Sequence, residues 1–279
     1  MEPREHLPEL FRLGYAPPLL EITARQWDEG AARDRAEQIV EETPVAIVYN
    51  GIPHVVMMAT PADLADFALG FSITEELIRT PSDLQDVQIV RYSQGIEVQA
   101  TIHLDCEAVV GSRPRRLAGR TGCGICGSDS IAAVLKTSHP VGPGAPVRVG
   151  AIQTALETLT AHQTLNSAAG AVHAAAWATA DGVVDLARED VGRHNALDKL
   201  IGALLKRGTG PETGFVIVTS RASFEMVQKA TVFGSPLLAA ISGPTGLAVR
   251  VAEQAGLTLV GFARRGRLTV YTRPERVVA

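Results

Sequence analysis

The chain has 279 residues, enough for about two domains at roughly 150 residues per domain, or for one large domain with an elaboration. Charged residues make up 20% and the apolar set AVILMFWYC makes up 46%, which excludes an intrinsically disordered chain. No window of about 18 residues is continuously apolar, and the N-terminal MEPREHLPEL lacks the apolar segment of a secretion signal. We therefore expect a globular cytoplasmic protein that does not enter a membrane.

The net charge of −4 conceals an uneven distribution along the chain. Residues 1–100 contain 17 acidic and 7 basic side chains, whereas residues 101–279 contain 13 acidic and 19 basic ones. Of the basic residues 22 are Arg, whose planar guanidinium holds phosphate with two parallel hydrogen bonds, although a codon bias toward Arg explains the count equally well. No long basic helix is present, which argues against nucleic-acid binding. We expect the second part of the chain to bind smaller anions.

Residues 1–111 predict a small N-terminal α+β unit with an irregular leader over residues 1–17. Two β-rich runs within Pro44–Met58 are joined by Asn50-Gly51, a dipeptide typical of tight hairpins. Thr60 is the expected N-cap of a helix whose first residue is Pro61. Two further strands are expected at residues 87–90 and 96–104.

Residues 131–279 predict a domain in which strands and helices alternate. The expected strands cover residues 172–180, 183–186, 215–219, 237–241, 258–262 and 267–271. The expected helices include one near the start that ends at Thr137, then residues 152–162, 194–207, a helix from Phe224, and 247–254. This order predicts a partly parallel sheet covered by helices, with ligands binding at the loops that follow the strands.

The segment between these units, residues 112–130, reads SRPRRLAGRTGCGICGSDS. Its high glycine content and small apolar surface predict a flexible loop. No acidic residue lies between Glu107 and Asp129, and neighbouring positive charge favours thiolate over thiol. Cys123 and Cys126 are therefore candidates for a nucleophilic or sulfur-carrying pair.

Other functions remain open for the same pair. A thioredoxin-like redox motif is one, although that motif normally opens a helix after a strand. A zinc site that also uses His103 and Cys106 is another, because one histidine and three cysteines form an accepted tetrahedral set. The run Gly122-x-Gly124-x-x-Gly127 also matches a dinucleotide fingerprint, but no apolar strand precedes it.

Three loops in the second part of the chain are candidate anion sites. Ser220, Arg221 and Ser223 lie between an expected strand and an expected helix, where backbone N–H groups suit a phosphate. Ser242–Thr245 repeats this arrangement. The third is Phe262-Ala263-Arg264-Arg265-Gly266-Arg267, which lies between two strands. Helix capping by Ser or Thr in the first two loops, and a solvated turn in the third, are the structural alternatives.

Asp190, Arg193 and His194 place a carboxylate, a guanidinium and an imidazole just before or at the start of an expected helix. A role for His194 in proton transfer or substrate contact follows from the imidazole pKa near neutrality. Helix capping by Asp190 or Asn195 is the structural alternative.

Four blocks of the sequence together resemble one protein family. They are TGCGICG (121–127), REDVGRHNALDKLIG (188–202), TSRASFEMVQKA (219–230) and SGPTGLAVRVAEQAGLTLVGFARRGRLTVYT (242–272). In order and spacing they resemble the formate dehydrogenase accessory sulfurtransferase family of the FdhD type, over most of residues 40–272. The resemblance implies a cytidine-deaminase-like three-layer α/β/α domain without the zinc chemistry of deaminases.

The resemblance also implies a function. Proteins of this kind accept sulfur from a cysteine desulfurase as a persulfide and pass it to molybdenum bis(molybdopterin guanine dinucleotide), Mo-bis-MGD, before formate dehydrogenase receives that cofactor. By residue, Cys123 matches the persulfide-bearing cysteine, Cys126 its partner, and Phe262–Arg267 the cofactor-binding segment. GDP is then expected to bind as a fragment of the cofactor, and the protein is expected to form a homodimer. The rival hypotheses are a non-catalytic cofactor chaperone and a zinc or redox module.

Overall fold

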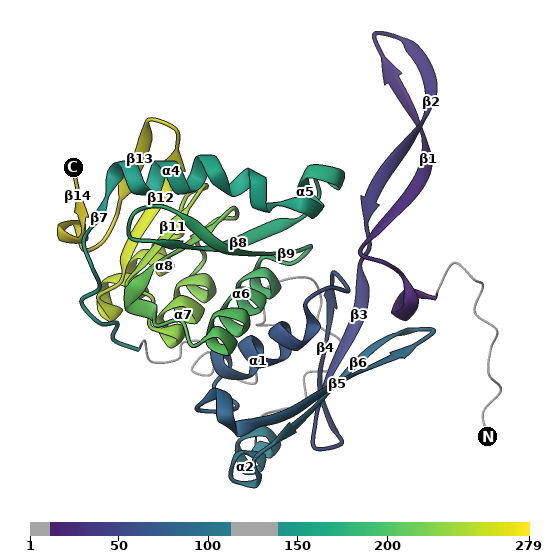
Figure 1. The fold of residues 1–279 in the computed structure, drawn as a ribbon, viewed down its shortest axis with the longest axis horizontal. Helices are drawn as coiled ribbons and strands as arrows, with labels where there is room; N and C mark the ends of the chain where they lie inside the picture. Colours follow the sequence, from purple (N-terminus) through teal and green to yellow (C-terminus); the bar gives the residue numbers. More distant parts are fainter. Residues whose placement is uncertain (1–11, 113–138) are drawn as a thin grey trace.

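A computed structural model describes residues 12–112 and 139–279 of the chain, and Figure 1 shows their path. The larger part is built on a six-stranded sheet with the order β13-β12-β11-β10-β8-β9. The central pairs β10–β11 and β11–β12 are parallel, and the outer pairs are antiparallel. Its strands are β8 (His173–Thr179), β9 (Val184–Asp190), β10 (Gly214–Val218), β11 (Leu237–Ala240), β12 (Thr258–Arg264) and β13 (Arg267–Val270).

Helices cover both faces of this sheet (Figure 1). One face packs against α4 (Val149–Leu159), which is followed by α5 (Thr164–Ala169). The other face packs against α6 (Arg193–Arg207), α7 (Phe224–Phe233) and α8 (Gly246–Ala255). Successive residues of the fully buried β10 alternate between the two cores, as the pleat of a strand requires. The expected three-layer α/β/α arrangement is confirmed.

A second, four-stranded sheet has the order β4-β3-β6-β5 and packs one face against α1 (Leu64–Thr74). Its strands are β3 (Thr43–Tyr49), β4 (Ile52–Ala59), β5 (Leu84–Tyr92) and β6 (Gly95–Ile102). The expected hairpin is present, because Asn50 and Gly51 adopt φ values of 47° and 81° between β3 and β4. The smaller α+β unit is therefore confirmed, and α2 (Leu104–Ser112) follows it.

The start of α1 differs from the sequence prediction. The helix begins at Leu64, and its N-cap is Asp63 with φ 53°, whereas Thr60 lies outside it. The backbone N–H of Thr60 donates to Asp190, and its carbonyl oxygen accepts from Lys199. The prediction of Thr60 as N-cap was wrong because long-range partners hold this residue.

Helices α1 and α6 cross at a contact formed by two glycines. A Cβ on Gly70 would overlap the carbonyl oxygen of Asp198, and one on Gly202 would overlap that of Asp66. Beside this contact the buried carboxylate of Asp198 accepts from Thr74 at 2.6 Å and pairs with Lys229 at 3.0 Å. The two units of the fold therefore share one tightly packed helix pair.

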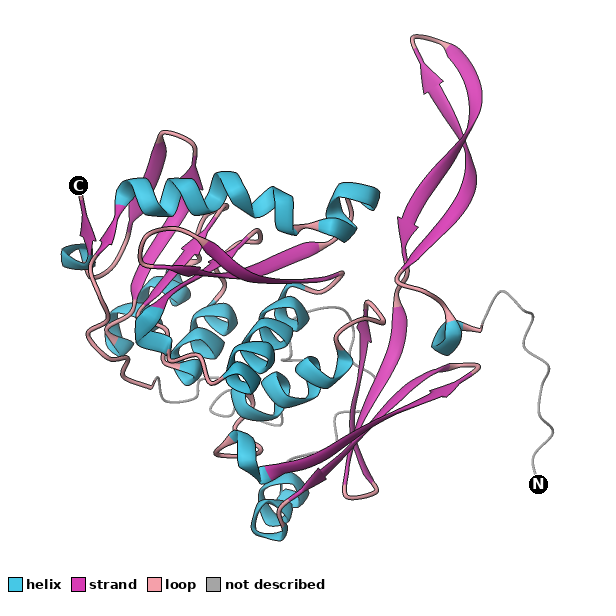
Figure 2. Ribbon diagram, viewed as in Figure 1, coloured by secondary structure: helices cyan, strands magenta, loops and turns pink. Residues whose placement is uncertain are grey.

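The remaining elements are a ribbon and short pieces. The ribbon, β1 (Leu19–Asp28) paired antiparallel with β2 (Ala31–Val40), extends away from the rest of the described chain in Figure 2. No strand was predicted from the sequence for these residues. The short strands β7 (Val147–Arg148) and β14 (Val277–Val278) pair with each other, and 3-10 turns occur at Leu13–Tyr15, Pro81–Asp83, Thr160–His162, Pro211–Thr213 and Pro274–Arg276.

The other expected strands and helices of the described ranges are present within a few residues of their predicted ends, and the helices α2 and α5 were not predicted. The expected helix that ends at Thr137 and the greater part of the leader lie outside the described residues. Among the described residues, no helix is long and apolar enough to span a membrane.

Candidate functional site

Three loops meet at the carboxyl ends of the parallel strands β10, β11 and β12. Ala222 of the first loop forms a parallel bridge with Pro244 of the second, and the Thr245 N–H donates to the Ala222 carbonyl at 3.1 Å. The Phe262 N–H donates to the Ser242 carbonyl, also at 3.1 Å, which ties the end of β12 to the second loop. The structure thus brings together the three segments that sequence analysis selected, at the edge of the sheet where α/β proteins bind ligands.

Phe262 has an unusual backbone conformation. Its φ is 49°, it lies at a register shift between β12 and β13, and it is 41% exposed. The ring packs on Gly243, where a Cβ would approach Phe262 Cζ to 2.7 Å. A bulky residue in the left-handed region costs free energy, and such strain concentrates at functional sites. Phe262 is therefore placed to offer an aromatic surface to a ligand.

The rest of the β12–β13 connection divides into buried and exposed residues. Ala263 is 1% exposed and packs in the core beneath α4, so its side chain is not available to a ligand. Arg264 and Arg267 are paired across the turn, and both are exposed. Arg265 is 90% exposed and forms an ion pair with Glu157 of α4 at 3.3 Å. Three arginines thus stand at the rim of the edge, one of them partly neutralised.

The N-termini of α7 and α8 differ in how their first N–H groups are satisfied. Thr245 caps α8, because its Oγ1 accepts from the Ala248 N–H at 3.2 Å. Ser223 occupies the same position before α7 but makes no side-chain capping bond, and within the described ranges its buried Oγ has no hydrogen-bond partner. Ser220 donates to the Arg221 carbonyl. The capping interpretation therefore holds for the second loop and fails for Ser223.

The N-terminus of α6 lies at the same edge. The Ala174 carbonyl of β8 accepts from the Thr219 N–H, so the start of β8 lies beside the loop after β10. His194 Nε2 stands 3.1 Å from Glu225 Oε2, which links the first turns of α6 and α7, although the pair lacks hydrogen-bond geometry. Burial lowers the pKa of His173 at the start of β8, and the nearby charge of Arg193 lowers it further. The start of β8 and the first turn of α6 therefore bring two imidazoles and the Arg193 guanidinium to this edge, with the Asp190 carboxylate acting on His173 in the opposite direction.

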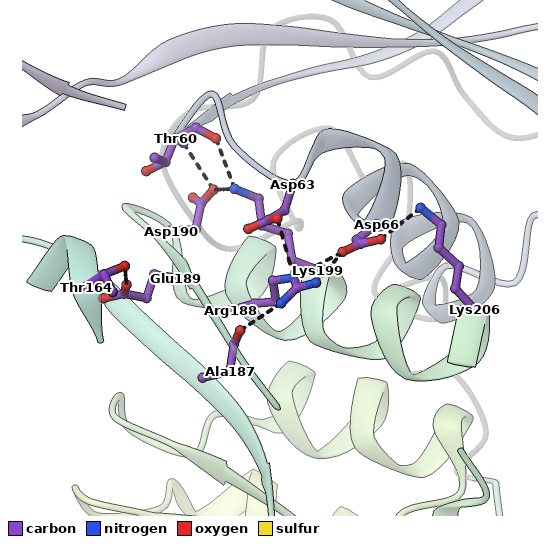
Figure 3. A network of polar contacts seen from close by, with 10 residues as sticks. All are labelled: Thr60, Asp63, Asp66, Thr164, Ala187, Arg188, Glu189, Asp190, Lys199 and Lys206. Carbon is purple, nitrogen blue, oxygen red and sulfur yellow. Dashed lines mark hydrogen bonds and ion pairs between the residues drawn. The ribbon is translucent and has the colours of Figure 1, made fainter. Parts of the chain in front are cut away.

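A fully buried ion pair fixes the turn between β9 and α6 (Figure 3). Asp190 and Lys199 are both 0% exposed, and their charged atoms are 2.6 Å apart. Asp190 also accepts from the Gly192 N–H at 2.8 Å and from Asn195 at 3.0 Å. Through Thr60 the same pair holds the connection between β4 and α1. Neither Asp190 nor Asn195 is the N-cap of α6, so the capping alternative for these two residues was wrong.

The neighbouring charges have structural partners (Figure 3). Arg188 donates to Asp66 at 2.8 Å, and Asp66 also pairs with Lys206. Glu189 accepts from the N–H groups of Leu165 and Asn166 at 2.8 Å each, which satisfies the start of α5. These residues hold elements together and leave no free charge for a ligand.

Cys123 and Cys126 lie outside the described residues. Cys106, the third cysteine, is buried in the core of the four-stranded sheet. Burial raises the pKa of its thiol, and the nearby Asp83 carboxylate adds to the effect. His103, the other candidate zinc ligand of this segment, lies beside Asp105, with 3.3 Å between His103 Nδ1 and Asp105 Oδ2. Within residues 12–112 and 139–279 no group of three His, Cys, Asp or Glu side chains could hold a metal ion.

The roles of Thr60 and Lys199 were not predicted from the sequence. Lys199 gave one usable signal, because it occupies a position of α6 that the apolar pattern places in the core. A buried ammonium group needs a partner, and the sequence did not show which residue that partner is. Thr60 gave no signal of its own, because its partner Asp190 is 130 residues away.

Comparison with known proteins assigns the family. The model of the FdhD/NarQ family matches residues 40–278. The chain belongs to this family. A protein named sulfur carrier protein FdhD from Cupriavidus necator is 50% identical over 252 residues, which cover 90% of this chain and 88% of that protein. Proteins of the same name from Bordetella petrii and Xanthomonas campestris pv. campestris are each 48% identical, covering 88% and 91% of both chains respectively.

A solved structure supports the fold of this FdhD/NarQ member. A protein of Desulfotalea psychrophila, described as a formate dehydrogenase accessory protein, superposes with a TM-score of 0.76. The match covers 94% of this chain and all of the other, at 23% sequence identity. At that identity the comparison establishes the shared fold.

Proposed function

We propose that this protein is a sulfur carrier that serves formate dehydrogenase in the cytoplasm. The observation that carries the proposal is the identity of 48–50%, over about nine-tenths of the chain, to proteins named sulfur carrier protein FdhD. The CGICG sequence within an arginine-rich, acid-free segment supports it, because sulfur transfer between proteins requires a thiolate.

In the proposed reaction, the Cys123 thiolate attacks the terminal sulfur of a persulfide on a cysteine desulfurase. The new S–S bond forms at Cys123, the old one breaks, and the desulfurase cysteine leaves as a thiolate, so no external oxidant is needed. Positive charge from Arg113, Arg115, Arg116 and Arg120 favours the attacking thiolate. Cys126 acts as the partner thiol that resolves or relays the sulfur.

The substrate that receives the sulfur is Mo-bis-MGD. Its guanine nucleotide ends carry phosphates, and the edge formed by Arg221, Ser223 and Phe262–Arg267 supplies guanidinium groups, a helix N-terminus and an exposed aromatic ring. Ser220 lies in the same loop, and GDP is the fragment with which this site is tested. Molybdenum is part of the substrate in this proposal, and in residues 12–112 and 139–279 no group of three His, Cys, Asp or Glu side chains could hold a resident metal.

The test is mass spectrometry of the purified chain after incubation with a cysteine desulfurase and cysteine. We expect one additional sulfur on the wild-type protein, located on the peptide that contains Cys123. Cys123→Ala abolishes this adduct, whereas Cys126→Ala reduces it less. Cys106→Ala is the matched control, because that thiol is buried in the core, and it leaves the adduct unchanged.

Two outcomes would replace the proposal. If the wild-type protein never acquires sulfur but binds the cofactor, it is a non-catalytic chaperone. If metal analysis finds stoichiometric zinc bound through the CGICG sequence, it is a zinc module. Restored formate dehydrogenase activity by Cys123→Ala, in a strain that lacks this protein, would also contradict the proposed carrier role.

A further inference from the structure

The first turns of α6 and α7 contain most of the unsatisfied polar atoms of the described chain. Among the described residues, the buried side-chain atoms without a hydrogen-bond partner are Arg193 Nε, His194 Nε2, Ser223 Oγ and Arg273 Nε. The first three belong to the start of α6 and to the N-cap of α7. A buried polar atom without a partner costs free energy, and each one needs an explanation. Their clustering at two adjoining helix ends indicates a role in binding.

Glu225 lies in the first turn of α7, directly beside this group. Its Oε2 is 3.1 Å from His194 Nε2, and the two side chains are only 13% and 10% exposed. The distance is short, but the imidazole nitrogen is not hydrogen-bonded to the carboxylate. Glu225 also occupies the positive end of the α7 dipole, which the proposed phosphate site at Ser223 uses as well. A phosphate bound at Ser223 therefore meets a competing carboxylate.

Protonation of His194 removes this conflict. Two negative charges in a largely buried place repel one another unless a positive charge lies close to both. His194 Nε2 is the nitrogen beside Glu225, and imidazole is the side chain whose charge changes between about pH 5 and 8. An imidazolium at this position gives the pair no net charge. The donors of the site then attract the phosphate without opposition from Glu225.

The other charged groups around His194 on α6 and β8 do not supply a proton-dependent charge. Arg193, its neighbour on α6, is positively charged at every pH and attracts an anion equally in acid and in base. His173 of β8 is neutral at pH 7, because burial and the charge of Arg193 lower its pKa.

The remaining charges of the neighbouring elements are paired. Asp190, in the turn between β9 and α6, is 2.6 Å from Lys199, and both are completely buried. Lys229, one turn along α7 from Glu225, is 3.0 Å from Asp198. Neither pair has a charge free to neutralise Glu225.

We propose that His194 and Glu225 form a proton-linked pair in the phosphate site, so that an anionic ligand binds at the N-terminus of α7 together with one proton on His194. The inference rests on the proposed function, because it concerns the same phosphate site and adds its regulation by pH. By reciprocity the bound phosphate keeps His194 protonated. The affinity is then highest at low pH and falls by up to about tenfold for each pH unit as the pH rises.

The experiment measures the affinity of GDP-mannose for the full chain by calorimetry from about pH 8 to about pH 6. GDP itself is unsuitable for the pH series, because its terminal phosphate takes up a proton near pH 6. Both phosphates of GDP-mannose are esterified, as in a dinucleotide, and keep a constant charge over this range. We expect the affinity to rise at least about tenfold from pH 8 to pH 6. Titrations in two buffers of different ionisation enthalpy count the protons taken up.

Two variants separate the members of the pair. His194→Gln keeps the affinity of wild type at pH 8, but loses the increase at pH 6 and the proton uptake. Glu225→Gln removes the competing charge at constant size, so its affinity at pH 8 approaches that of wild type at pH 6. Arg221→Ala, by contrast, weakens binding equally at both pH values, because a guanidinium is charged throughout. Far-ultraviolet circular dichroism checks that each variant is folded.

Two further histidine variants are the controls. His103→Gln changes another imidazole beside a carboxylate, Asp105, at 3.3 Å, but at the start of α2 in the other unit. His173→Gln changes the second imidazole at the same edge. Both leave the proton uptake unchanged.

Binding of GDP-mannose that is independent of pH and takes up no proton would overturn this inference and leave the phosphate site and the sulfur carrier role intact. Proton uptake that persists in His194→Gln and disappears in His173→Gln would place the proton on the wrong imidazole, which also overturns it. If neither GDP nor GDP-mannose binds at any pH, the phosphate site itself is wrong and this inference fails with it. Sulfur acquisition by Cys123 is measured separately and decides the carrier role.

Discussion

Lys199 occupies a position in α6 where the apolar pattern of the helix calls for an aliphatic residue. Its ammonium group is completely buried, 2.6 Å from Asp190 and 3.0 Å from the Thr60 carbonyl. Removing one member of such a pair leaves the other charge unpaired in the interior, which costs about 3–5 kcal/mol. We expect Lys199→Met to lower the free energy of unfolding by an amount in this range, measured by urea denaturation.

Lys206→Met on the same helix provides the comparison. Its ammonium also pairs with a carboxylate, Asp66, but the side chain is 42% exposed. An exposed pair contributes at most about 1 kcal/mol. If the two substitutions destabilise the protein equally, the buried pair does not hold β9, α6 and the β4–α1 connection together.

His173 predicts a dependence of stability on pH. Burial and the charge of Arg193 lower its pKa in the folded protein below the unfolded value of about 6.5. As the pH falls through that value the unfolded chain binds the proton first, so the free energy of unfolding decreases. His173→Gln should therefore lose less stability than wild type between about pH 7.5 and 5.5. Parallel profiles of the two proteins in chemical denaturation would contradict the assignment.

Individual site residues were only partly predictable from sequence. Ser223 and Thr245 present the same signal, a hydroxyl residue just before a helix, but only Thr245 caps its helix. Ala263 belongs to an arginine-rich segment that suggests exposure, but the strand pleat buries it under α4. Such differences depend on neighbours supplied by distant parts of the chain, which local patterns do not contain.

At the scale of elements, periodicity predicted most of the sheet and helices of the larger domain. Fully buried strands such as β10 are short apolar runs, and glycines such as Gly208, with φ 67°, end helices where expected. The ribbon β1–β2 could not be found this way, because both of its faces are largely exposed and its residues are mostly polar. The start of α1 was missed because Asp190 and Lys199 hold Thr60.

The crossing of α1 and α6 predicts a strong effect of a single methyl group. A Cβ at Gly70 would overlap the Asp198 carbonyl oxygen, so Gly70→Ala must push the two helices apart. Overpacking of this kind costs typically 1–3 kcal/mol, and backbone on both sides places this site at the upper end of that range. Thermal and urea denaturation of Gly70→Ala measure the loss, and Gly202→Ala should behave in the same way.

Gly150→Ala is the control with the opposite expected sign. Gly150 lies in α4 and is exposed, and a Cβ there would meet nothing within 4 Å. Alanine is favoured over glycine in helices by up to about 1 kcal/mol, so this change should be neutral or stabilising. A Gly70→Ala protein as stable as Gly150→Ala would show that the helices do not meet as closely as described.

At the scale of the whole molecule, the fold converts separate sequence signals into one basic edge. Arg193, Arg221 and the arginines of 264–267 are distant in sequence, but they follow or precede strands that end at the same side of one sheet. The alternation of strands and helices was sufficient to predict that the loops at 219–223, 242–245 and 262–267 converge, because parallel strands bring their carboxyl ends together. The position of Arg193 at the same edge was not predicted. The alternation was also not sufficient to predict which charges are neutralised, as Arg265 is by Glu157.

This edge predicts how GDP binding responds to substitution and salt. Charge-assisted hydrogen bonds to phosphate contribute about 1.5–3 kcal/mol, so Arg221→Ala should weaken GDP binding by about tenfold or more in calorimetry. The triple change Arg264→Ala, Arg265→Ala and Arg267→Ala should weaken it as well, and Arg265→Ala alone the least because Glu157 already partners that side chain. Added salt should weaken wild-type binding, since these guanidinium groups are exposed.

Arg207→Ala is the matched control for GDP binding, because Arg207 lies at the opposite end of α6 from Arg193 and pairs with Asp185 at 3.4 Å. GDP affinity that ignores both the arginine substitutions and the salt concentration would place the nucleotide elsewhere on the molecule.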